Sequence, residues 1–153
     1  MGQGGNTVNW KAEAVEKLRR YDAMCRAVRN LPVELDRLEA EYTALGSGLR
    51  VHTLAGRDER RQEDRLMDNL MARQQLKWSL NQALSWTEVV NNALSALEPE
   101  ERLILHRLYI LPQVGALAQL SEKLGVEKSS IYRRRDKALN KFTLSLYGAQ
   151  ESN

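Results

Sequence analysis

The sequence predicts an all-α protein, a long coiled-coil-like N-terminal helical hairpin followed by a C-terminal helix-turn-helix bundle. Three observations carry this prediction. The 153-residue chain is rich in strong helix formers, it contains only three prolines, and its apolar residues recur at helical three- and four-residue steps. Its length fits one ordinary domain, or a small domain joined to an extended oligomerisation element. We assign residues 1–97 to the hairpin and residues 98–148 to the bundle.

The first helix of the hairpin is expected to begin after Thr7 or Asn9, since either side chain can accept a capping hydrogen bond. Its narrow apolar seam consists of Leu18, Tyr21, Cys25 and Val28, and then of Leu35, Leu38, Tyr42 and Leu45. Pro32 lacks an amide donor, so we expect a break or kink there, with Pro32 in the first turn of a second helix. Gly46 is expected to end that helix, and the chain then reverses direction before about Gly56.

A second long helical pattern follows the charged run 57–65. Its broken apolar stripe consists of Leu66, Leu70, Leu76, Leu80, Ala83, Val90, Leu94 and Leu97. Ser85-Trp86-Thr87-Glu88 has the spacing of a capping box, so this pattern fits either one continuous helix or two helices with a joint near Ser85. The side chains expected to cover core or interface are Trp10, Trp78 and Trp86. Because hairpins with narrow seams often bury more surface by pairing, we expect a homodimer or a higher homo-oligomer.

Pro99 marks the start of the C-terminal bundle. Proline suits the first turn of a helix, and the two glutamates that follow it lie where the helix dipole favours acids. The core face of this helix consists of Leu103, Ile104, Leu108 and Tyr109. The pair Leu111-Pro112 is expected to end it.

Two further helices joined by a tight turn are expected to form a helix-turn-helix. The first spans about residues 115–124 and stops at Gly125, where a positive φ carries no steric penalty. The second begins one or two residues after Val126. Ser121 is the small residue that two closely packed helices need, while Val126 and Ile131 are expected to plug the space beneath the turn. The apolar side of the second helix consists of Ile131, Ala138, Leu139, Phe142 and Leu146.

The opposite side of that last helix is rich in basic and hydroxyl side chains. Residues 115–147 include seven bases and three acids, a net charge of +4 against +3 for the whole chain. Hydroxyls near a helix start reach phosphates or base edges, arginine binds guanine with two hydrogen bonds, and lysine mostly contacts the DNA backbone. The predicted DNA-binding residues are Lys128, Ser129, Ser130, Tyr132, Arg133, Arg134, Arg135 and Lys137. The expected partner is double-stranded DNA, read in its major groove.

The C-terminal third resembles the fourth, promoter-reading region of bacterial sigma factors. The residues that carry the resemblance are Leu97-Glu98-Pro99-Glu100-Glu101-Arg102, Leu120-Ser121-Glu122-Lys123-Leu124-Gly125-Val126, Ile131-Tyr132-Arg133-Arg134-Arg135 and Ala138-Leu139. With a charged hairpin containing Asn30-Leu31-Pro32 in front, most of the chain is loosely similar to the ArpU- and RinA-like regulators that activate late genes of phages and prophages. The resemblance implies that the last helix reads promoter DNA and that the preceding helices contact RNA polymerase.

Two positions depart from the sigma pattern. Three residues after Ile131 the pattern has an apolar residue, whereas this chain has Arg134, which either lies along the core edge or reaches a phosphate. The pattern favours Thr or Ser directly after the turn valine, and this chain has Glu127 there. Nothing in the first part resembles the sigma region that melts the promoter, so a complete sigma factor is not expected. The alternative is a DNA-packaging adaptor resembling a phage terminase small subunit, although those usually carry the DNA reader before the hairpin.

The sequence contains no constellation that indicates catalysis or a cofactor. His52 and His106 are far apart and have no clustered ligands, so a metal site is not expected. No phosphate-binding glycine loop, nucleophile elbow or metalloprotease motif occurs, and we expect no enzyme activity. Cys25 is expected to be a buried thiol on the seam. Since the sequence has neither a secretory signal pattern nor an apolar stretch of roughly 20 residues, we expect a cytoplasmic, nucleoid-associated protein of a bacterial host, with no membrane partner.

Overall fold

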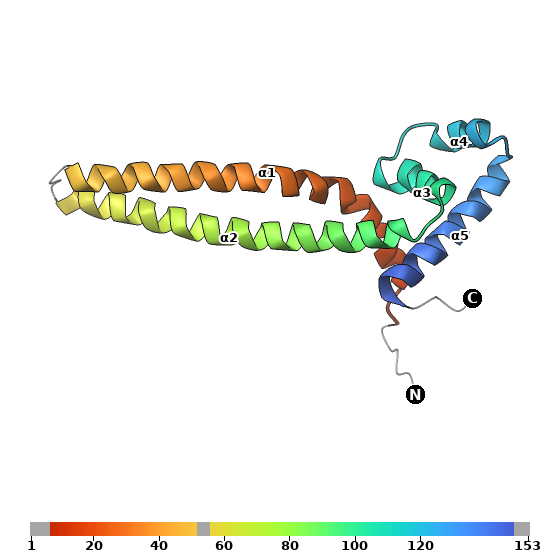
Figure 1. Cartoon of the computed structure of the whole chain (residues 1–153), viewed down its shortest axis with the longest axis horizontal. Coiled ribbons are helices and arrows are strands. Elements are labelled where there is room, and N and C mark those ends of the chain that lie inside the picture. Colours follow the sequence, from red (N-terminus) through yellow and green to blue (C-terminus); the bar gives the residue numbers. More distant parts are fainter. Residues whose placement is uncertain (1–6, 52–55, 149–153) are drawn as a thin grey trace. The chain divides into compact units, whose positions relative to one another are not determined.

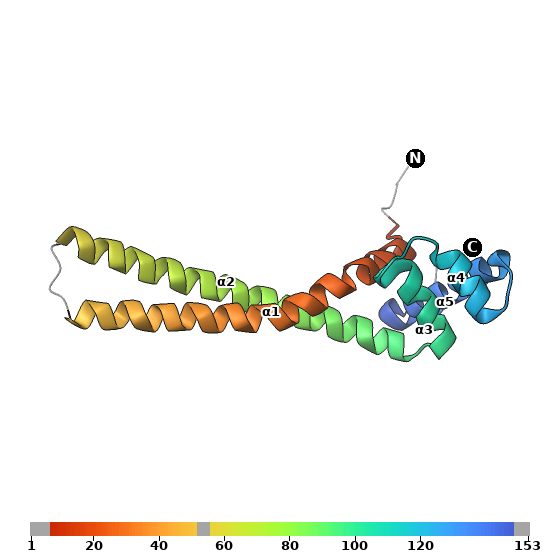
Figure 2. The same cartoon turned by 90° about the horizontal axis from the view of Figure 1, so that it is seen from above.

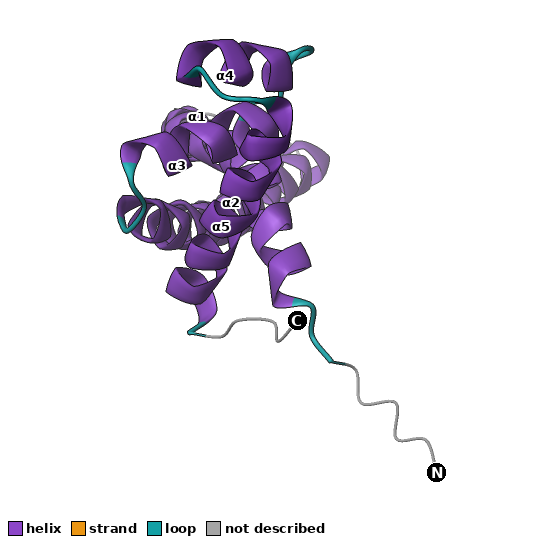
Figure 3. Cartoon of the chain, turned by 90° about the vertical axis from the view of Figure 1, so that its right-hand side faces the viewer, coloured by secondary structure: helices purple, strands orange, loops and turns teal. Residues whose placement is uncertain are grey.

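The computed structural model describes residues 7–51 and 56–148, and this part of the chain contains helices and loops but no strand (Figure 3). The elements, labelled in Figure 1, are α1 (Trp10–Val51), α2 (Gly56–Ser95), α3 (Pro99–Leu105), the π-helical turn η1 (His106–Ile110), α4 (Ala116–Leu124) and α5 (Lys128–Tyr147). The all-α prediction is confirmed. The two long N-terminal helices of the predicted hairpin are also present.

The helices divide into two compact units that do not coincide with the predicted domains 1–97 and 98–148. One unit, here called the C-terminal unit, combines the chain up to Met24 with the chain from Trp86 onward. The other, called the hairpin unit, is Cys25–Ser85. The start of α1 and the end of α2 therefore belong with the short helices, because they share a core with them.

That shared core collects apolar side chains from α1, α2, α3, η1 and α5. Its buried members are Ala14, Leu18, Val90, Ala93, Leu94, Leu97, Leu105, Ile110, Ala138, Leu139 and Phe142. Aromatic contacts extend it at the chain ends. The rings of Trp10 and Tyr147 lie 4.6 Å apart between centroids, and the Lys17 ammonium lies 4.6 Å from the centroid of the Trp86 ring. The first turns of α1 are thus part of the scaffold that holds α5.

In the hairpin unit, the part of α1 from Cys25 and the part of α2 up to Ser85 run antiparallel, side by side (Figures 1 and 2). Leu38 and Ala83 are buried in their seam. Asn69 is also buried there, and its Nδ2 donates to the Leu38 carbonyl at 2.8 Å. Cys25 is half-buried rather than buried. Trp78 is 65% exposed, so it is no part of this core.

The helix start after Asn9 is confirmed, because the Asn9 Oδ1 atom accepts a hydrogen bond from the Ala12 amide at 2.9 Å. The predicted helix end at Gly46 is wrong, and so is a break at Pro32. The helix is continuous through both Pro32 and Gly46. A glycine costs a helix interior about 1 kcal/mol and a proline about 3 kcal/mol, local penalties that packing along a seam of this length offsets. The second long helix is also continuous, since α2 passes through Ser85, and residues 52–55 of the predicted reversal lie outside the described part.

We expect Leu18→Ala to destabilise the C-terminal unit by about 2–5 kcal/mol, because this fully buried side chain lies in the core shared with α5. Denaturant unfolding can be followed by tryptophan emission in a Trp78→Phe background, which leaves Trp10 and Trp86, both in this unit. The control is Glu16→Ala, an exposed neighbour on α1 that should change stability little. Equal effects of the two substitutions would show that the start of α1 is not part of this core.

Candidate nucleic-acid interface

The first short helix starts as predicted, at Pro99. The amide of Glu98 donates to Glu101 Oε1 at 3.1 Å, one half of a capping box at the helix start. The helix then widens into a π turn, where the Leu111 amide donates to the His106 carbonyl at 2.9 Å. The π turn was not predicted. Its sequence signal is the five-residue spacing of Leu105 and Ile110, which are both buried in the shared core.

A tight turn at Gly125 joins α4 to α5, and the predicted helix stop at this glycine is confirmed. Gly125 has φ +64°, in the left-handed region. Its amide donates to Glu122 O at 3.3 Å, and the Val126 amide donates to Ser121 O at 3.1 Å, the two bonds of a Schellman motif. The Ser121 hydroxyl in turn donates to the Val126 carbonyl. These bonds fix the path of the chain from one helix into the next.

A second apolar cluster holds the beginning of α5. Its buried members, one each from α3, α4 and α5, are Ile104, Leu120 and Ile131. The half-buried residues packed around them are Leu103, Leu108, Leu117, Leu124 and Val126. Val126 and Ile131 therefore pack beneath the turn as predicted. Because three helices meet there, the first turn of α5 has a fixed orientation in the C-terminal unit.

The start of α5 has backbone groups suited to an anion. Glu127, the residue before the helix, makes no side-chain capping hydrogen bond. Its carbonyl accepts hydrogen bonds from the amides of Ser130 and Ile131, at 3.0 and 3.2 Å. The positive end of the helix dipole and the amides before Ser130 favour a phosphate here, whereas the carboxylate of Glu127 opposes one.

Most of the predicted DNA-binding residues lie on the open side of α5. The exposed ones are Lys128, Ser129, Tyr132, Arg133 and Lys137, and Ser130 is half-buried. Helical geometry puts Ser129 and Arg133 on the side of α5 opposite Ile131, which is buried. The structure thus exposes a hydroxyl and a guanidinium group on the side of the helix opposite Ile131, and leaves the ammonium groups of Lys128 and Lys137 accessible on its flanks.

Arg134 and Arg135 differ from the other six, because each is half-buried and has a partner within the chain. Arg134 Nη1 forms an ion pair with the carboxylate of Glu100 on α3, and 39% of the Arg134 side chain stays exposed. Arg135 forms an ion pair with Asp136 at 3.0 Å, and its guanidinium lies 5.0 Å from the centroid of the Tyr132 ring. DNA contacts of these two arginines stay predictions. A phosphate or base would have to compete with Glu100 for Arg134 and with Asp136 for Arg135.

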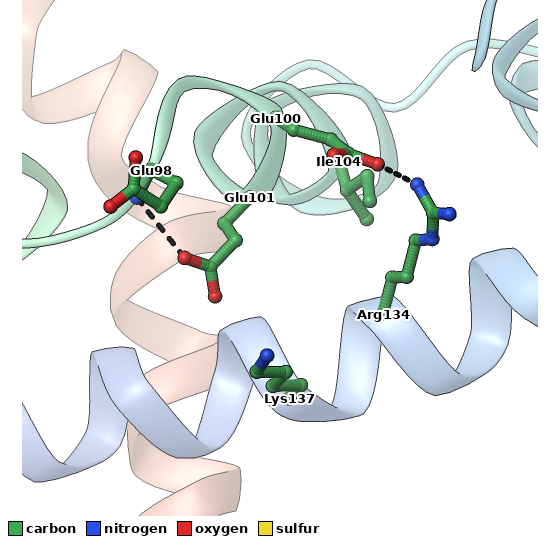
Figure 4. A pocket seen from close by; sticks show the side chains of 6 residues that line it. All are labelled: Glu98, Glu100, Glu101, Ile104, Arg134 and Lys137. Carbon is green, nitrogen blue, oxygen red and sulfur yellow. Dashed lines mark hydrogen bonds and ion pairs between the residues drawn. The ribbon is translucent and has the colours of Figure 1, made fainter.

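Between α3 and α5 lies a hollow of about 300 Å³ (Figure 4). Its lining residues are Glu98, Glu100, Glu101, Ile104, Arg134 and Lys137. Lys141 Nζ, on the next turn of α5, donates to Glu101 Oε1 at 2.8 Å. Acidic side chains of α3 and basic side chains of α5 face each other here, and their two ion pairs link the helices. The position of Glu101 at a helix start follows from the sequence, whereas its partner Lys141 is 40 residues away along the chain and leaves no local signal.

The Glu101–Lys141 pair predicts a pH dependence of stability. Burial raises the pKa of Glu101, but hydrogen bonds from Lys141 and from the Glu98 amide outweigh it, so the net pKa lies below 4.5. A carboxylate with a lowered pKa stabilises the fold above its unfolded pKa, and this contribution is lost as the pH falls through the folded pKa. We expect the melting temperature of Glu101→Gln, which keeps the acceptor for Glu98, to fall less than that of the unsubstituted chain between about pH 5 and pH 3. Parallel curves would contradict this assignment.

Within the described part of the chain, no helix is both long enough and apolar enough to cross a membrane. The same residues contain no group of three or more side chains placed to hold a metal ion, and His52 lies outside them. Comparison of the chain with protein-family models, with curated proteins and with solved structures finds no match.

Proposed function

We propose that this chain is a sequence-specific DNA-binding transcriptional regulator that reads the major groove of double-stranded DNA with α5. One observation carries the proposal. The first turns of α5 are held on one side by Ile131 and its cluster, while the opposite side exposes Ser129 and Arg133. Lys137 is also exposed, at the hollow between α3 and α5. A B-form major groove admits one α-helix, and a helix fixed on one side and polar on the other meets that requirement.

The exposed groups suggest different roles at the DNA. Arg133, opposite the buried side, has the guanidinium group that binds a guanine edge with two hydrogen bonds, and we assign it this role. Ser129 and the amides of the first turn suit a phosphate, as does Lys137 one turn beyond Arg133. The ring of Tyr132 lies against the guanidinium of Arg135. We assign this contact to positioning the two side chains rather than to reading a base.

The regulatory part of the proposal rests on the resemblance to sigma factors and to ArpU- and RinA-like regulators. By that resemblance the protein activates phage or prophage genes, works in the bacterial cytoplasm at the nucleoid and contacts RNA polymerase through the helices before α5. It needs no enzymatic activity and no cofactor for this role. A DNA-packaging adaptor of the terminase small-subunit kind uses the same helix-turn-helix chemistry, so the experiment has to separate the two.

The experiment is genome-wide selection of the DNA fragments bound by the purified chain, repeated with Arg133→Ala. We expect one recurring motif upstream of a gene cluster, and a loss of discrimination at one base pair of it, equal to about 1–3 kcal/mol, in the variant. The control is Arg19→Ala, an exposed arginine on α1, which should keep the motif. Enrichment confined to a terminase locus would favour the packaging adaptor, and no enrichment at all would refute DNA reading.

Lys137→Ala should act differently from Arg133→Ala. If its ammonium contacts a phosphate, removing it weakens binding to all sequences alike and lowers the slope of log affinity against log salt by about 1. Titrations of a specific and an unrelated duplex at several salt concentrations measure both quantities. A change in base preference with an unaltered slope would assign Lys137 to a base edge instead.

A further inference from the structure

In the hairpin unit, α2 has a row of exposed residues that lie outside its seam with α1. The row follows the 4-3-4-3-4 spacing of a coiled coil and consists of Met67, Met71, Gln74, Trp78, Asn81 and Ser85. Its three large apolar side chains, Met67, Met71 and Trp78, are 57%, 61% and 65% exposed. Single exposed apolar residues are common on protein surfaces, whereas an aligned row of them marks an interaction face.

This row lies on the side of α2 that faces away from α1. The seam side of α2 includes the buried residues Asn69 and Ala83, and Asn69 donates its hydrogen bond to α1. At 100° per residue, Met67 and Trp78 lie about 160–180° around the helix from Asn69. α2 therefore has two coiled-coil faces, of which α1 covers one.

The row contains no charged residue over its whole length. At the next positions of the same spacing, Asp64 precedes it and Glu88 follows it, so charges bound the row at both ends. A partner with an acidic or basic face would gain nothing from such a surface. A second copy of the same row meets it without like-charge repulsion, because every position is neutral. The amides of Gln74 and Asn81 are both donors and acceptors, so they can pair with their own kind.

We infer that the outer row of α2 is a homodimer interface that pairs with the same row of a second chain. The row spans 18 residue steps, a length of about 27 Å at 1.5 Å per residue. That is slightly less than three heptads, near the lower limit for a two-helix coiled coil, so dimerisation should depend on protein concentration. The inference concerns the hairpin unit alone and does not depend on DNA binding.

The test is sedimentation of the full chain over a range of concentrations, compared with Met71→Glu and Trp78→Glu. We expect the unsubstituted chain to form dimers, and each variant to raise the dimer dissociation constant roughly 100-fold or more, because a carboxylate is buried without a partner. The matched control is Val33→Glu, which puts the same charge on α1 at a residue that is 69% exposed and outside the row. This control should dimerise like the unsubstituted chain.

Far-UV circular dichroism distinguishes dissociation from unfolding, since the variants should keep their helicity at concentrations where they are monomers. A Met67→Gln, Met71→Gln double variant repeats the test without a charge and with good helix formers. Monomers of the unsubstituted chain at all concentrations would overturn the inference. So would dimers that persist in both kinds of row variant, or that are lost in Val33→Glu.

Discussion

The one-sided burial of α5 is the constraint on which the candidate interface depends. Ile131 anchors the beginning of the helix in the cluster with Ile104 and Leu120, and Phe142 anchors its second half in the shared core. The two anchors are 11 residues apart, about 16 Å along the helix. A helix held at both places cannot rotate about its axis, so the side that carries Arg133 stays open. The same burial recruits the start of α1 and the end of α2 into the C-terminal unit.

In the hairpin unit, a buried amide constrains how α1 and α2 align. Asn69 Nδ2 donates to the Leu38 carbonyl across the seam, and a shift that removed this acceptor would leave the Nδ2 group buried without a partner, as the Oδ1 atom of the same amide already is. Such polar residues in a coiled-coil seam commonly fix register at some cost in stability. The register matters beyond the seam, because it also sets which residues of α2 face outward. Met71 and Trp78 are exposed as a consequence.

Sequence signals that act within one turn of the chain predicted the structure accurately. Asn9 caps the start of α1 with a hydrogen bond, Pro99 is the first residue of α3, and Gly125 ends α4 with a positive φ. Each lies where it was expected. The errors have non-local causes. Pro32 and Gly46 carry penalties of about 1–3 kcal/mol in a helix, and whether the seam offsets them depends on a partner helix far along the chain. A core shared by distant segments, such as the one that joins the start of α1 to α5, likewise leaves no local mark in the sequence.

In the predicted site, too, local spacing predicted the orientation of α5, but it did not predict the distant ion-pair partners of its arginines. The spacing of Ile131 and its neighbours was enough to orient α5, but the run Arg133-Arg134-Arg135 gave three equivalent candidates. Glu100 is 34 residues from Arg134 in sequence, and Asp136 is next to Arg135, and these two acids draw both arginines into ion pairs. Within the described part of the chain, Arg133 forms no ion pair and remains exposed. Internal pairing therefore concentrates the accessible positive charge of this run on one guanidinium, which a nucleic acid would meet without first breaking a contact.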